Sequence, residues 1–261
     1  AYHLLSDKAF EPALPSPGQF IEASADAAFG FTNPVHVPIA IERRDRAVKF
    51  AVTALRVIFF HELAHVLRGH AIYVTSNGSS SAGDVLVESG PPKPESIQSG
   101  DVRRRALETD ADDFSGRFMA KAFFREFAPG ELTFSNPQFC AKAFEVLVGV
   151  VLTYSLFEKN AQYHSGSLRA YILLGSMFGE LGLDTKDSAR WTFVRVDALQ
   201  QLMIDNNLLD ASANALNADE ALALAKDTLA YRDAKMLDWL RHMHPTLQPK
   251  EPGATATSTA Q

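Results

Sequence analysis

Apolar residues recur at helical spacing through most of the chain. From Arg43 to a stop at Gly69 they occupy nearly every face, as in a helix buried all round. A second apolar stripe begins near Asp101, a good N-cap, and ends near Ala128. Further helices are predicted at about 137–159, 167–181, 188–209 and 217–242. Only the segment PVHVPIAI at 34–41 has a strand pattern, so the sequence predicts a mainly α (α+β) fold with a small N-terminal β-sheet.

Long stretches of Ser, Gly and Pro divide the chain. The stretch at 75–100 has little periodicity and is expected to form a flexible insert between two strong helices. We expect residues 1–185 to form the main domain and residues 186–243 to form a helical part packed on it. The last residues, 244–261, are expected to be a disordered tail.

Composition narrows the class of protein. The chain has 261 residues, 46% of them hydrophobic, which is enough for a sizeable core. Its formal charge is −6, and no basic run exceeds the cluster at 103–105, so we expect no nucleic-acid partner. The longest apolar run, 146–157, is shorter than the roughly 20 residues that span a bilayer, which favours a buried helix and no membrane partner.

The compartment is predicted from cysteine and from the visible N-terminus. Cys140 is the single cysteine and cannot form an internal disulfide. No positively charged start followed by an apolar segment is present, so a cytoplasmic location is expected. Position 1 is Ala rather than Met, which leaves room for a removed upstream signal.

The segment FFHELAHVLRGH, at 59–70, carries the candidate chemistry. Residues four apart lie on one face of a helix, so His61 and His65 can offer ring nitrogens to one metal ion. Glu62 then points slightly aside, where it can take a proton from a water that the ion activates. A catalytic zinc site needs a third protein ligand and leaves one position open.

Two candidates exist for the third ligand. His70 follows His65 by one residue too few for the compact HExxHxxGxxH pattern, and we expect it to interact with carbonyls at the helix end instead. Glu108 and Asp112 share a face beside the apolar stripe of the second helix, where carboxylates are costly unless they are paired or bound to metal. Glu108 is therefore expected to be the ligand, and Asp112 to accept the free N–H of a zinc-binding histidine.

This combination resembles a known family. His61, Glu62 and His65, followed by Glu-Thr-Asp-Ala-Asp at 108–112, is similar to the gluzincin zinc metallopeptidases, whose third ligand is a glutamate in an E-x-x-x-D or E-x-x-A-D motif. The resemblance covers about residues 44–128. It implies a hydrolase with a zincin-like helical core. The mainly helical pattern with one long insert further resembles the Lit-type phage-exclusion peptidases.

A third segment resembles part of the same family. YHSGSLRAY, at 163–171, is similar to an H-P-x-x-x-x-R segment whose His or Arg helps hold the active site or the developing oxyanion. Ser165 stands in place of the proline, and Arg169 is one residue closer than in that pattern. His164 and Arg169 are therefore candidate catalytic residues, and Tyr163 is an equal candidate for stabilising the oxyanion.

The predicted function is zinc-dependent cleavage of peptide bonds in a protein or peptide substrate, as an endopeptidase. His61, His65 and Glu108 would hold Zn²⁺, and Glu62 would be the general base. An alternative is a protease-like regulatory or interaction module that keeps the metal but lacks peptidase activity. A third, purely structural interpretation predicts no stoichiometric metal.

Overall fold

The computed structural model describes residues 20–23, 35–38, 40–76, 97–156, 165–205, 228 and 230–236. The predicted mainly α class is confirmed, because helices account for most of these residues. The long helices are α2 (Ile41–Leu67), α5 (Ile97–Phe123), α6 (Pro137–Leu156), α7 (Gly166–Glu180) and α8 (Thr185–Asp205). Shorter helical segments are α3 (His70–Ser76), η3 (Pro129–Glu131) and η5 (Arg232–Met236). The expected tail at 244–261 lies outside the described residues.

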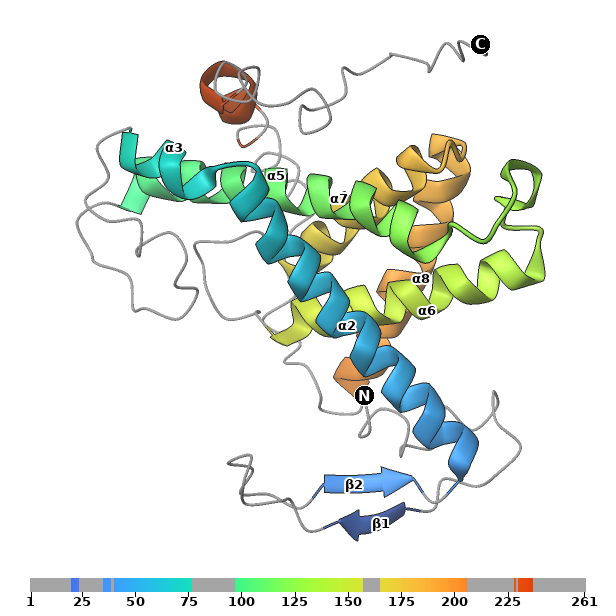
Figure 1. Ribbon diagram of the computed structural model, residues 1–261. Coiled ribbons are helices and arrows are strands. Elements are labelled where there is room, and N and C mark those ends of the chain that lie inside the picture. The colour runs from blue at the N-terminus through green and yellow to red at the C-terminus, as the bar shows by residue number, and fades with distance from the viewer. Residues whose placement is uncertain are drawn as a thin grey trace.

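Two short strands precede the helices. β1 (Phe20–Ala23) pairs antiparallel with β2 (Val35–Pro38), and Phe20 lies opposite Pro38 (Figure 1). β2 is shorter than the predicted strand segment at 34–41, because α2 already begins at Ile41.

Helix boundaries differ from the sequence prediction at both ends of α5 and after Gly69. α5 begins at Ile97, so Asp101 lies inside the helix and is not its N-cap. α3 extends to Ser76. The insert expected at 75–100 is thus shortened at both ends, and residues 77–96 lie outside the described part. α5 also stops at Phe123, before the predicted end near Ala128, since Phe124 already starts a bend.

The core is formed where four helices meet. α5 packs most extensively against α7, and α2 packs against both α6 and α5 (Figure 1). The main apolar cluster includes the completely buried side chains of Phe139, Leu147, Leu173 and Phe178. Burial of each such side chain contributes roughly 1.5–3 kcal/mol to the stability of the fold. α5 and α7 approach each other closely at Gly116, which has no side chain. A side chain at this position would collide with the carbonyl of Leu173. α5 is thereby held between α2 and α7, whose side chains meet around it.

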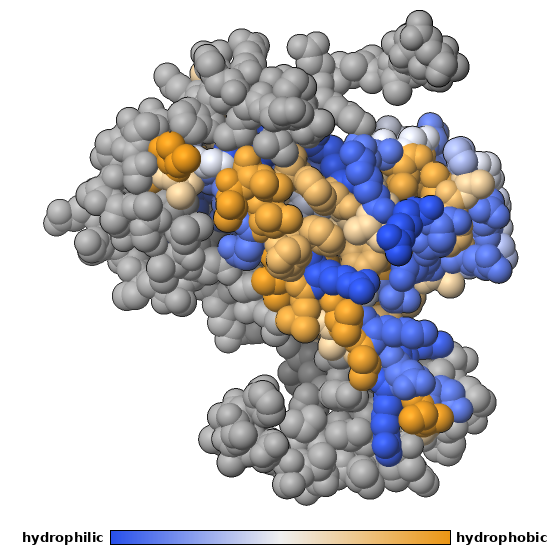
Figure 2. Space-filling view, viewed as in Figure 1, coloured by the Kyte–Doolittle hydropathy of each residue, from blue (hydrophilic) through white to orange (hydrophobic). Residues whose placement is uncertain are grey.

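The expectation that the first helix is buried all round is wrong, because one face of α2 remains apolar and exposed. We call this face the α2 stripe, and it consists of the exposed side chains of Ile41, Val48, Val52, Leu55, Phe59 and Val66. Figure 2 shows apolar side chains gathered on the face that α2 presents to the viewer. In the described part, α2 and α6 are long and apolar enough to cross a membrane by length and composition alone. That is weak evidence, because a core helix of a soluble protein meets the same criteria.

Candidate metal centre

Two histidines from the end of α2 and one glutamate from α5 meet in the interior. The Nε2 atoms of His61 and His65 lie 3.1 Å apart. Glu108 places Oε2 3.1 Å from His61 Nε2 and Oε1 3.5 Å from His65 Nε2. All three side chains are buried, and their donor atoms lie within 4.8 Å of one another. This cluster could hold a metal ion.

Asp112 and Arg169 surround the cluster. His61 Nδ1 lies 2.9 Å from Asp112 Oδ1, a close contact without the angle of a formal hydrogen bond. Arg169 donates from Nε to Asp112 Oδ2 at 2.9 Å and from Nη2 to Glu108 Oε2 at 2.9 Å. Its Nη2 also lies 3.3 Å from His61 Nε2. The guanidinium group therefore ties the two carboxylates of α5 to α7.

The start of α7 explains the position of Arg169. Ser165, which stands where the resembled segment has proline, is the N-cap of α7 and accepts a hydrogen bond from the Leu168 amide. Gly166 packs against the Tyr154 backbone, where a Cβ atom would be only 3.1 Å from the Tyr154 carbonyl oxygen. This close start of the helix places Arg169 in its first turn, facing inward.

Tyr154, from α6, is a further member of the site. Its hydroxyl donates to Asp112 Oδ1 at 2.5 Å, and its ring lies 4.7 Å from the Arg169 guanidinium carbon. Burial raises the pKa of Tyr154 well above its ordinary value, and the Asp112 carboxylate raises it further. The phenol therefore stays protonated and remains a donor to Asp112.

The electrostatics of the site favour a cation. Burial alone would lower the pKa of His61, but the carboxylates of Asp112 and Glu108 raise it to about 10. Burial would raise the pKa of Glu108, yet His65 and Arg169 hold it well below its usual range. The pKa of Asp112 is lowered in the same way, because Arg169 and His61 outweigh its burial. Two carboxylates thus share one guanidinium, and the cluster attracts a further positive charge.

His70 is not where the sequence prediction placed it. It was expected to interact with carbonyls at the helix end, but its Nδ1 lies 2.8 Å from His65 Nδ1 and its Nε2 lies 3.0 Å from Asp110 Oδ2. Arg68 donates two hydrogen bonds of 2.7 Å to the same Asp110 carboxylate. Burial lowers the pKa of His70 despite the raising effect of Asp110. His70 therefore belongs to a buried polar chain that ends on His65.

The other predicted catalytic residues are placed differently. Glu62 is exposed on α2, next in the chain to His61. Tyr163 and His164 lie outside the described residues. The structure thus brings together His61, His65, Glu108, Asp112 and Arg169, with Glu62 at the neighbouring surface.

Sequence reasoning did not find Tyr154, Arg68 or Asp110 as members of the site. Tyr154 lies in the longest apolar run, where the pattern indicates only core. Asp110 lies off the apolar stripe of α5 and was given no role, but its side chain is completely buried. Carboxylates stand at every second position from 108 to 112, and therefore on different sides of α5. This spacing was the signal that could have indicated polar partners on more than one side of the helix.

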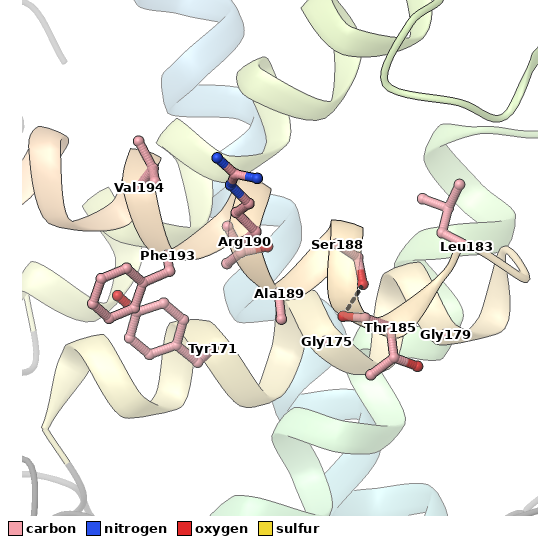
Figure 3. Close-up of a pocket in the computed structure, with 11 residues that line it drawn as sticks. Tyr171, Gly175, Gly179, Leu183, Thr185, Ser188, Ala189, Arg190, Phe193 and Val194 are labelled. Atoms are coloured by element: carbon pink, nitrogen blue, oxygen red, sulfur yellow. Dashed lines mark hydrogen bonds between the residues drawn. The ribbon is translucent and has the colours of Figure 1, made fainter.

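A cavity of about 610 Å³ lies elsewhere, between α7 and α8 (Figure 3). Its wall includes Tyr171 and Phe193, whose rings stack at 6.0 Å, and Ser188, whose hydroxyl donates to the Thr185 carbonyl. None of the residues that line it belongs to the histidine and carboxylate cluster. The acid–base and ligand groups therefore indicate the cluster, not this cavity, as the candidate site.

Comparison with protein-family models, with curated proteins and with solved structures finds no match to this chain.

Proposed function

We propose that this protein is a zinc-dependent peptidase that cleaves peptide bonds of a protein or peptide substrate. The observation that carries the proposal is the buried triangle of His61, His65 and Glu108 beside an exposed glutamate, Glu62. The gluzincin assignment, the narrower similarity to Lit-type peptidases, the zincin-like core with a small N-terminal sheet and the cytoplasmic location belong to the same proposal.

The donor set fits zinc. Zinc bonds to histidine nitrogen and carboxylate oxygen are about 2.0–2.1 Å long, so tetrahedral ligands lie roughly 3.3 Å from one another. The two histidine Nε2 atoms lie 3.1 Å apart, and Glu108 reaches them through different oxygens, Oε2 at 3.1 Å from His61 and Oε1 at 3.5 Å from His65. Three protein ligands of this type leave one position for water or substrate, as in catalytic zinc sites.

Each residue of the chain then has a defined task. Zinc, when bound, would supply an activated water and a Lewis acid for the peptide carbonyl. Glu62 accepts the proton of the attacking water and delivers it to the leaving amine. Asp112 orients His61, and Arg169 compensates the charges of Glu108 and Asp112.

The α2 stripe supports a polypeptide substrate with apolar side chains near the cleaved bond. Glu62 follows Phe59 by three residues and Leu55 by seven, so it lies on the same side of α2 as the stripe. Val66 continues the stripe beyond Glu62 and is also exposed. The general base and an uncovered apolar surface are thus continuous, and a substrate that reaches Glu62 must lie against this surface.

Replacing Phe59 by serine should raise KM for a peptide with apolar residues beside the cleaved bond roughly tenfold, with kcat and zinc content unchanged, because the lost ring removes apolar contact area. Phe193→Ser is the matched control, since Phe193 is 61% exposed and Phe59 is 60% exposed. An unchanged KM for Phe59→Ser would contradict this role. If Phe59→Ser changes the oligomeric state but not KM, the α2 stripe binds a second copy of the chain. If it weakens binding to lipid vesicles but does not change KM, the stripe binds a lipid surface.

Metal removal tests the proposed function directly. The purified protein should contain stoichiometric zinc by elemental analysis and generate new termini, mapped by mass spectrometry, in a mixture of proteome-derived peptides. A chelator should abolish this cleavage, and added Zn²⁺ should restore it. Stoichiometric zinc without any new termini would instead indicate a metal-binding regulatory module. Failure to bind zinc after its addition would contradict both.

A further inference from the structure

The chain turns directly after the HExxH segment. α2 ends at Leu67, and Arg68 follows as the C-cap. Gly69 has φ of 64°, a left-handed conformation that favours glycine and ends the helix. α3 then starts at His70, so the His70 side chain returns to His65 instead of continuing around α2. The one-residue displacement from the compact zinc motif therefore gives His70 a different position.

His70 connects His65 to a carboxylate on another helix. Its Nδ1 lies 2.8 Å from His65 Nδ1, and its Nε2 lies 3.0 Å from Asp110 Oδ2. Arg68 holds Asp110 at both oxygens, and Arg68, Asp110 and His70 are all completely buried. The ring of His70 is thus fixed at both nitrogens.

These contacts determine where the protons lie. The carboxylate of Asp110 can only accept, so His70 must donate from Nε2. A neutral His70 then has its lone pair on Nδ1, and His65 must donate from its own Nδ1 to fill the 2.8 Å contact. The remaining nitrogen of His65, Nε2, keeps its lone pair and points at His61 and Glu108.

We propose that His70, anchored by Asp110 and Arg68, is a positioning residue that holds His65 in the tautomer and ring orientation able to bind a metal ion. The inference rests on the proposed metal site. His61 has a carboxylate directly beside its own Nδ1, because Asp112 Oδ1 lies 2.9 Å from it. α5 thus supplies one ligand, Glu108, and one supporting carboxylate for each histidine. Asp110 acts on His65 through His70, and Asp112 lies directly beside His61.

Zinc affinity of His70 variants tests this role. His70→Leu removes the acceptor and should weaken Zn²⁺ binding about 10–100-fold, measured by competition with a chromophoric chelator. His70→Asn keeps a carbonyl oxygen near the position of Nδ1 and should recover most of this loss. Val74→Ala is the control for general disturbance of α3, since Val74 is buried on the same helix, and should leave zinc affinity unchanged. Equal zinc affinity of His70→Leu and Val74→Ala would overturn the proposal.

A spectroscopic measurement avoids dependence on folding of the variants. In the zinc-free wild-type protein, ¹⁵N NMR of the imidazoles should show His65 protonated at Nδ1 and His70 protonated at Nε2. Protonation of His65 at Nε2 alone would overturn the proposal. Zinc binding without peptidase activity would contradict the proposed function but leave this inference intact, and the tautomer of His65 decides the inference even if no zinc binds.

Discussion

Replacing Glu62 by glutamine should reduce peptide cleavage by about 10²–10⁴-fold, which is the usual contribution of a general acid–base group. Glutamine has nearly the shape of glutamate but cannot accept the proton of the attacking water. Glu62 is exposed and belongs to neither the ligand triangle nor its supporting carboxylates, so zinc content should not change. The measurement is kcat/KM together with elemental analysis of the same sample.

Glu42→Gln is the matched control for this change. Glu42 is also an exposed glutamate on α2, but it lies in the first turn, far along the helix from His61. Its replacement should leave both cleavage and zinc content unaltered. Equal activity of Glu62→Gln and the wild type would remove Glu62 from the mechanism and favour a different base or a module without peptidase activity.

The helical class was predictable from the apolar periodicity, and the apolar stripe of α5 indicated which side of that helix is buried. The buried side of α2 was not predictable, because its apolar residues occupy nearly every face. Glu108 and Asp112 lie four residues apart on the buried side, and their position beside the apolar stripe indicated the pair. Asp110 was not predictable from that periodicity, because it lies two residues from each and so on another side of α5. Its partners, Arg68 and His70, reach it only because Gly69 turns the chain.

The long-range partners of the site were also beyond the sequence pattern. Tyr154 lies in a long apolar run, so its pattern indicates only a core position. Its hydrogen bond to Asp112 depends on how α6 packs against the other helices. The sequence singled out Arg169 through a family resemblance, but its contacts with Glu108 and Asp112 depend on how closely α7 approaches α5. That approach depends on Gly116, a residue that no hydrophobic pattern indicates.

Replacing Arg169 by methionine should lower the free energy of unfolding by about 3–5 kcal/mol, because it leaves buried carboxylates without their cation. Arg169, Glu108 and Asp112 are each almost completely shielded from solvent, so water cannot take over the role of the guanidinium. Chemical denaturation of the zinc-free protein, followed by far-UV circular dichroism, gives the value. Lys121→Met is the matched control.

Lys121 also joins α5 to α7, through a 3.3 Å ion pair with Glu180, but the Lys121 side chain is 74% exposed. Because the Lys121 ammonium is solvated, its ion pair is worth at most about 1 kcal/mol, so Lys121→Met should change stability little. A similar loss in both variants would show that connection of α5 to α7, not compensation of buried charge, explains the effect of Arg169.

A double variant separates charge from packing at Arg169. The stability lost in Arg169→Met could come from the carboxylates left without a cation. In that case, adding Glu108→Gln should recover part of the stability, because it removes one of the two buried negative charges. If the loss comes from the missing side-chain volume, the two substitutions should add. Recovery would mean that Arg169 makes the carboxylate-rich cluster compatible with a folded core. Additivity would contradict that role.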